Sequence, residues 1–277
     1  MTSTSLSDRL AALATILATV AAATGLAIPG LYRDAPNWAQ QARGTDLATL
    51  FLAVPLLVIG LWTARRGSSL GRLVVVAGLM YVVYNYAIFA FSVAMNPLTV
   101  VHIAILGLAI WSLGLAVSSA AFKDAGEAIG SRLFRRISAG VLIGVAILFG
   151  LLWLGQIANT TFTGVLPPDL VRAGLATNPV YALDLAFFLP LCAAAGIGLI
   201  RRNRSAYFAL PMLIWVPLTS AGILGGFLFA AAAGDEVPIV VAAILGGLGL
   251  AAAGVAAVPL VRPKFTSSLS PVVGRAV

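Results

Sequence analysis

Eight apolar stretches, each about as long as a membrane-spanning helix, constrain the fold of this chain more than any other feature. A helix needs about 20 mostly apolar residues to cross the hydrocarbon core of a bilayer. We therefore predict an all-α membrane protein with eight transmembrane helices and the lipid bilayer as its main partner. The stretches cover residues 10–30, 46–64, 71–93, 98–118, 138–158, 179–200, 206–231 and 238–260.

The composition excludes soluble classes of protein. Hydrophobic residues make up 61% of the chain and charged residues 9%, whereas soluble domains carry about 25% charged residues. The net charge of +8 does not indicate a nucleic-acid partner. The basic residues flank the apolar stretches and form no patch on a soluble domain.

The basic residues alternate between the connections, which predicts the orientation of the chain. Fourteen of the 17 Lys and Arg residues lie in segments assigned to one side. By the positive-inside rule this side is cytoplasmic and contains both termini. The Ala, Gly, Val and Arg content is typical of bacteria, so we expect a bacterial plasma membrane. The fourteen are Arg9, Arg65, Arg66, Arg72, Lys123, Arg132, Arg135, Arg136, Arg201, Arg202, Arg204, Arg262, Lys264 and Arg275; the other three are Arg33, Arg43 and Arg172.

The first stretch has two interpretations. Arg9, the apolar residues 10–28 and the small residues 21–23 resemble a secretory signal with a cleavage site. The run is long for such a signal, and the repeat described next needs this helix. We expect a retained first span.

The second stretch of each half shares a residue pattern, which predicts an internal repeat. Four spans per half is an even number, so both halves enter the membrane alike, as in repeats related by an axis along the membrane normal. We predict a first repeat at 1–118, a cytoplasmic linker at 119–137, a second repeat at 138–262 and a cytoplasmic tail at 263–277. The matching residues are Asp46, Leu47, Pro55, Leu56, Gly60, Arg65 and Arg66 in one half and Asp184, Leu185, Pro190, Leu191, Gly196, Arg201 and Arg202 in the other.

A short polar segment precedes this stretch in each half. Residues 34–44 have a capping Asp34, an early proline and a terminal Gly44, and residues 167–174 have a similar form. Such features are typical of short helices. Neither segment is long enough to cross, so we expect two interfacial helices on the outer surface.

Asp46 and Asp184 are candidate functional groups, because a polar group inside a span is costly and needs a reason. One interpretation is that each stabilises a helix N-terminus. The other is a pair of carboxylates that faces one outer cavity and takes a cation or a proton. Both interpretations remain open.

The third and fourth stretches add more polar groups. Tyr81, Tyr84 and Asn85 share one helical face, and His102 lies at a depth where it could meet Asn85. Structural alternatives are interhelical hydrogen bonds for the first three and a backbone hydrogen bond for His102.

Gln156 and Tyr181 complete the candidate set, which lies in the outer half of the spans. The cytoplasmic halves are almost wholly apolar up to the arginines. This asymmetry predicts a polar cavity that opens outward and is closed below by apolar packing. The candidate ligand-binding residues are Asp46, Tyr81, Tyr84, Asn85, His102, Gln156, Tyr181 and Asp184.

Several absences narrow the chemistry. One histidine cannot supply two axial ligands to a haem, and the single Cys192 allows no disulfide within the chain. Neither Lys123 nor Lys264 lies inside a stretch, which excludes a retinal Schiff base. No phosphate-loop or HExxH motif occurs. We expect no cofactor and no metal, and no catalytic residue is identified.

Two rows of small residues predict close helix packing. Gly140 and Gly144 form a GxxxG pair, and Ala243, Gly247 and Ala251 form a ridge.

Three functions fit these features. We favour a transporter or binding protein for a small polar or cationic solute. The second is an accessory or structural subunit of a membrane complex. The third is a membrane-embedded enzyme that acts on a lipid head group at the outer leaflet, with Asp184 and His102 as acid and base. The possible protein partners are a second copy of the chain, in a homo-oligomer, or another member of a membrane complex.

Overall fold

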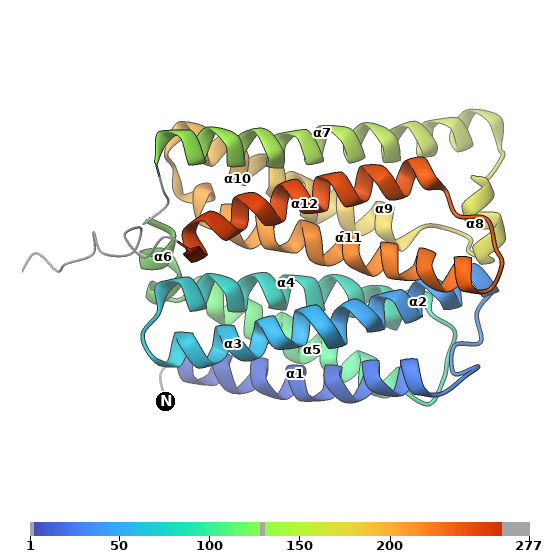
Figure 1. Ribbon diagram of the computed structural model, residues 1–277, viewed down its shortest axis with the longest axis horizontal. Helices are drawn as coiled ribbons and strands as arrows, with labels where there is room; N and C mark the ends of the chain where they lie inside the picture. Colours follow the sequence, from blue (N-terminus) through green and yellow to red (C-terminus); the bar gives the residue numbers. More distant parts are fainter. Residues whose placement is uncertain (1–2, 128–130, 262–277) are drawn as a thin grey trace, which may run out of the picture.

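The computed structural model describes residues 3–127 and 131–261, which form a bundle of helices (Figure 1). Eight of these helices are long and apolar enough to cross a membrane, and no strand occurs in this part of the chain. The predicted all-α, eight-span membrane fold is therefore confirmed. The C-terminal tail, with Arg262, Lys264 and Arg275, lies outside the described residues. The spans are Ser5–Ala27, Pro36–Arg65, Ser69–Ser92, Thr99–Ser118, Arg132–Thr163, Pro179–Arg201, Arg204–Ala232 and Ile239–Pro259.

The first four spans occupy the lower half of the bundle in Figure 1. In this half the first span packs against the fourth, and the third packs against both the second and the fourth. The helices are α1 (Ser3–Ala27), α2 (Pro36–Ala48), η1 (Thr49–Ala53), α3 (Val54–Arg65), α4 (Ser69–Ser92), α5 (Thr99–Ser118) and the connecting α6 (Ala120–Glu127).

The last four spans lie above them, with α7 at the upper edge of Figure 1. The fifth span packs mainly against the sixth, and the seventh packs against the eighth and against the second and third. The seventh span therefore joins the two halves. The helices are α7 (Arg132–Thr163), α8 (Pro168–Ala173), α9 (Pro179–Leu183), η2 (Asp184–Phe188), α10 (Leu189–Arg201), η3 (Arg204–Phe208), α11 (Ala209–Ala232) and α12 (Ile239–Val261).

The predicted interfacial helix at residues 34–44 was wrong. Helix α2 begins at Pro36 and runs without interruption through η1 into α3, so it is the first part of the second span. Gly44, interpreted as a helix terminus, lies within this helix and packs against the backbone of α11. At the other predicted position α8 does form a short separate helix, which ends at a left-handed Gly174.

The second and sixth spans each contain one turn of π-helix, η1 and η2. The turn η1 ends at Ala53, two residues before Pro55, and η2 ends at Phe188, two residues before Pro190. Val54 donates to the carbonyl of Thr49 and Leu189 to that of Asp184, five residues back in both cases. A proline ring clashes with the carbonyl four residues earlier, and a π turn widens the helix at that point. Such turns are rare and occur often at functional sites.

Glycines bring α2 and α11 into backbone contact. A Cβ atom at Gly44 would lie 1.9 Å from the amide nitrogen of Gly226 and 2.5 Å from the carbonyl oxygen of Gly222. Small residues allow this close approach where the hydrophobic effect cannot drive helix association in lipid. The tightest contact between the halves therefore depends on these glycines.

The two rows of small residues predicted to pack helices together do not do so within the chain. A Cβ atom at Gly140, Gly144 or Gly247 would have no neighbour within 4 Å. Ala243 and Ala251 are exposed. These rows lie on the outward faces of α7 and α12, because other faces of the two helices contact the bundle.

The two ends of the bundle differ in charge. We call the end that carries Arg65, Arg66, Arg201 and Arg202 the arginine-rich end; α6 also lies there, at the left of Figure 1. In α6, Phe122 packs against Phe208 of η3 with ring centroids 5.2 Å apart. The halves are thus also in contact at this end.

Candidate functional site

A cavity of about 70 Å³ lies between the second, third, sixth and seventh spans, toward the end opposite the arginine-rich one. A water molecule needs roughly 10–15 Å³ of such space, so the cavity accepts several waters or one small solute. The lining residues are Trp38, Gln41, Ala42 and Thr45 of α2, Tyr84, Asn85, Ile88 and Phe89 of α4, Val93, Val180 of α9, and Thr219 and Ile223 of α11.

The polar groups of the lining are held by the helices that carry them. The Asn85 amide donates to the Tyr81 carbonyl at 3.0 Å, and Thr219 Oγ1 donates to the Trp215 carbonyl at 3.0 Å. The Gln41 side chain lies against Gly226, and a side chain at position 226 would collide with the Gln41 amide. The cavity therefore has fixed hydrogen-bonding groups on three of its helices.

Asp184 lies behind the cavity wall as the first residue of η2. Its carboxylate accepts a hydrogen bond at Oδ2 from Trp153 Nε1 of α7, at 2.8 Å. The Tyr84 hydroxyl lies beside the same carboxylate. The side chain is buried, and among the described residues Oδ1 has no hydrogen-bond partner. Asp184 itself does not line the cavity. Two neighbours do: Tyr84, and Val180, which lies one helical turn before Asp184.

The two aromatic residues that contact this carboxylate, Tyr84 and Trp153, pack against further rings. Tyr84 meets Phe188 and Trp215 edge to face, with centroids 4.9 and 5.2 Å apart. Phe188 stacks on Trp215 at 4.7 Å. Trp153 stacks on Tyr181 at 4.5 Å. Trp215 Nε1 is also buried without a hydrogen-bond partner in the described part of the chain.

Asp46 lies elsewhere, between the first and second spans. Its Oδ2 accepts a hydrogen bond from the Tyr32 hydroxyl at 2.5 Å. Burial and this carboxylate raise the pKa of Tyr32 well above its usual value, so the hydroxyl remains a donor. A Cβ atom at Gly25 would lie 1.9 Å from Asp46 Oδ2, so only glycine admits the carboxylate here. Tyr81 belongs to the same region, since its hydroxyl donates to the Thr45 carbonyl at 3.2 Å.

His102 is enclosed within the first half. It is 1% exposed and packs against Phe89 and Tyr86, with ring centroids 4.7 and 5.7 Å apart. Neither ring nitrogen has a hydrogen-bond partner among the described residues. The Asn85 amide is directed instead to its own helix.

The eight candidate residues therefore fall into separate groups. Tyr84 lies beside the Asp184 carboxylate, and Tyr181 stacks on Trp153, which donates to that carboxylate. Asn85 lines the adjoining cavity. Asp46 and Tyr81 form a second group and His102 a third. Gln156 is half-buried on α7.

Sequence reasoning missed Trp153, Phe188 and Tyr32. A tryptophan inside a span needs a partner for its N–H group, which was the available signal for Trp153. Nothing local indicates which acceptor it meets, because Asp184 is 31 residues away in the chain.

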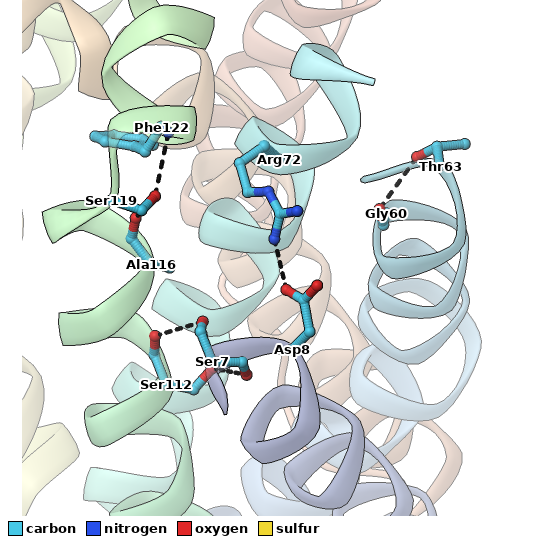
Figure 2. Close-up of polar contacts among 9 residues, drawn as sticks. All are labelled: Ser7, Asp8, Gly60, Thr63, Arg72, Ser112, Ala116, Ser119 and Phe122. Atoms are coloured by element: carbon cyan, nitrogen blue, oxygen red, sulfur yellow. Dashed lines mark hydrogen bonds and ion pairs between the residues drawn. The ribbon is translucent and has the colours of Figure 1, made fainter. Parts of the chain in front are cut away.

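The arginine-rich end holds a second polar cluster (Figure 2). Arg72 of α4 forms a buried ion pair with Asp8 of α1 at 2.5 Å. Beside it Ser7 Oγ donates to the Ser112 carbonyl at 3.0 Å, and Ser112 Oγ donates to the Ser7 carbonyl at 2.8 Å. The cytoplasmic halves of the spans were predicted to be almost wholly apolar up to the arginines, and this polar cluster lies at one of them, Arg72. Its partners Ser7 and Asp8 were not predicted as part of the bundle, because α1 begins before residue 10.

The described residues contain no group of three or more His, Cys, Asp or Glu side chains that could hold a metal ion. Comparisons with protein-family models, with curated proteins and with solved structures find no match to this chain. The fold by itself defines the class: eight apolar helices make this a multi-pass α-helical membrane protein.

Proposed function

We propose that the protein binds and carries a small polar solute in the cavity between its four central spans. The observation that supports this proposal is the cavity itself, with amide and hydroxyl groups on three helices and a buried carboxylate behind its wall. Its volume of about 70 Å³ is well below the roughly 300–1,000 Å³ of sites for drug-sized ligands. The solute therefore has few heavy atoms.

The orientation follows from charge. We infer that the arginine-rich end is cytoplasmic, with both termini on that side of a bacterial plasma membrane, because basic residues are retained on the cytoplasmic side. The cavity then lies in the outer half of the bilayer, and the Asp8–Arg72 cluster lies near the cytoplasmic surface.

We also infer that the chain consists of two four-span repeats related by an axis along the membrane normal. The support is that η1 and η2 have the same length and the same position relative to Pro55 and Pro190. In this alignment Asp184 corresponds to Thr49 and Asp46 to Tyr181, so the two aspartates are not equivalent. The cavity lies between the second and third spans of one repeat and those of the other, where transporters with repeats bind their substrates.

A second candidate is an accessory subunit or a homo-oligomer. The outward rows of small residues on α7 and α12 favour it, because such rows let another helix approach closely. Gentle detergent extraction followed by size analysis tests it, since a stable, monodisperse particle of the single chain contradicts an obligate subunit.

The enzyme alternative has no support from the geometry. Asp184 lies beside Tyr84, whereas His102 packs against Tyr86. These two tyrosines are two residues apart and point in directions about 200° apart around α4, so Asp184 and His102 lie on different sides of this helix. General acid–base catalysis needs both groups within hydrogen-bonding reach of one substrate.

Uptake by the purified protein in liposomes tests the proposed function. The panel comprises radiolabelled amines, amino acids, polyols and sugars. At least one should enter saturably, and Asn85→Leu should reduce its uptake by about tenfold, since a lost buried hydrogen bond costs about 1–3 kcal/mol. Asn159→Leu, at an exposed position on α7, is the matched control. Saturable uptake of no solute, or equal uptake by both variants, contradicts the proposal.

A further inference from the structure

Asp184 is a buried carboxylate with no counter-ion among the described residues. Its contacts there are the Trp153 indole and the Tyr84 hydroxyl, neither of which carries a positive charge. Asp8 of α1 and Arg72 of α4, by contrast, neutralise each other in a buried ion pair. Charged groups inside a membrane protein pair with one another or mark a substrate pathway. No basic side chain among the described residues pairs with Asp184, which leaves its charge available to a bound cation.

We propose that the solute is a small protonated amine and that Asp184 is its counter-ion. The inference rests on the proposed function and names the substrate class of the same site. Oδ2 is taken by Trp153, while the buried Oδ1 is free to accept a hydrogen bond. An ammonium group with an N–H supplies both the positive charge and the missing donor.

The aromatic surroundings fit the same ligand. A cation is attracted to the face of Tyr or Trp, and aromatic cages recognise alkylammonium groups. Tyr84, which lies beside the carboxylate, is in ring contact with Phe188 and Trp215, and Trp153, which donates to the carboxylate, stacks on Tyr181. The carboxylate is buried, and burial away from water strengthens the attraction between two charges.

Tyr84 connects the carboxylate to the cavity. It is part of the cavity wall, and its hydroxyl lies beside Asp184. An amine in the cavity reaches the carboxylate when the Tyr84 side chain turns away. The amides and hydroxyls of Gln41, Asn85 and Thr219 then face the rest of the solute.

Other cations fit the site less well. Calcium takes 6–8 oxygen ligands, whereas the described residues offer no cluster of three ligating side chains. A quaternary ammonium carries charge but no N–H, so it leaves Oδ1 unpaired. The site therefore distinguishes trimethylammonium, which has one N–H, from tetramethylammonium, which has none.

Calorimetric titration of the full chain in lipid nanodiscs tests this inference. The probes are trimethylammonium, tetramethylammonium and the neutral tert-butanol, all of similar size. Trimethylammonium should bind saturably. Tetramethylammonium should bind at least about tenfold more weakly because it leaves the buried Oδ1 unpaired, and tert-butanol likewise because its hydroxyl can donate a hydrogen bond but carries no charge. Asp184→Asn should weaken trimethylammonium binding at least about tenfold, since it removes one partner of a buried charge pair. Asp124→Asn, an exposed carboxyl on α6, should not.

A second measurement keeps the test valid if Asp184→Asn folds poorly. Saturating trimethylammonium should raise the unfolding temperature of the wild-type protein, and tert-butanol should not. Equal binding of the three probes, or equal binding by Asp184→Asn and the wild type, overturns the amine inference. If amines fail while a neutral solute is taken up and Asn85→Leu reduces that uptake by about tenfold, the proposed function stands and the inference alone falls. If no solute of any class binds, both fall.

Discussion

At Gly25 a single hydrogen atom occupies the place where a side chain would displace Asp46. The Asp46 carboxylate is 1% exposed and lies against this point of α1, held by the Tyr32 hydroxyl. A buried carboxylate is tolerated when charge-assisted hydrogen bonds replace its hydration. The residue therefore matters through the space that it leaves and not through any contact of its own.

We predict that Gly25→Ala destabilises the protein. The new Cβ atom displaces Asp46 and breaks its hydrogen bond with Tyr32, which costs about 1–3 kcal/mol for the buried group left unpaired. Thermal unfolding in detergent measures the change. Gly107→Ala on α5 is the matched control, because a Cβ atom there meets nothing within 4 Å; it should leave the unfolding temperature unchanged or raise it. Equal temperatures for both variants contradict this account.

At the scale of elements, the π turns change what the second and sixth spans present to the bundle. Each extra residue in a helical turn rotates the following helix by about 100°. In the sixth span η2 begins at Asp184 and ends at Phe188, so the carboxylate and one of its enclosing rings belong to the same irregular turn. The proline that follows each turn has no amide hydrogen to donate, so no hydrogen bond of the regular α-helix is lost there when the π turn forms.

The contact between α2 and α11 leads to a second prediction, which compares Gly44 of α2 with Gly222 of α11. Gly44→Ala should strongly destabilise the fold, because its Cβ atom would lie 1.9 Å from a backbone nitrogen that cannot move without separating the helices. Overpacking of this kind costs about 1–3 kcal/mol. Gly222→Ala should be nearly neutral, since its nearest neighbour would lie at 3.6 Å.

Thermal unfolding and uptake are measured together for this pair. The cavity lies beside the contact, lined by Thr45 of α2 and Thr219 of α11. Uptake should therefore fall in Gly44→Ala and persist in Gly222→Ala. A Gly44→Ala protein as stable and as active as Gly222→Ala shows that the two helices do not approach this closely.

At the scale of the whole molecule, the two ends of the bundle face different compartments. Labelling of introduced cysteines in intact cells tests the proposed orientation. Thr177→Cys, in the connection after α8, should react with a membrane-impermeant maleimide from outside. Lys123→Cys on α6 should react only after permeabilisation. The native Cys192 is fully buried and is the internal control. Reaction of Lys123→Cys in intact cells reverses the orientation.

The eight spans could be predicted from the sequence because each one satisfies its backbone hydrogen bonds within itself and needs a contiguous apolar segment. That information is local. The boundaries were less accurate where a span carries polar residues at its end: α1 includes Ser7 and Asp8, and the second span begins at Pro36, ten residues before Asp46. Ser7 and Asp8 are polar, but they are buried against other helices.

The candidate site was predictable only in part. Tyr84, Asn85 and Asp184 were identified as costly polar groups inside spans, and the structure places them in or next to one cavity. Their grouping was not predictable. Asp46 looks like a match for Asp184 in the sequence, yet it faces α1 and lies apart from the cavity.

Local composition was thus enough to predict eight helices that are long and apolar enough to cross a membrane, since hydropathy acts residue by residue along each helix. The tertiary structure alone showed that Trp153 and Tyr84 meet Asp184, and that Gly44 rather than Gly140 brings helices together. These contacts join residues far apart in the chain. Which faces of two apolar helices meet depends on van der Waals packing and hydrogen bonds between them, and no single segment contains that information.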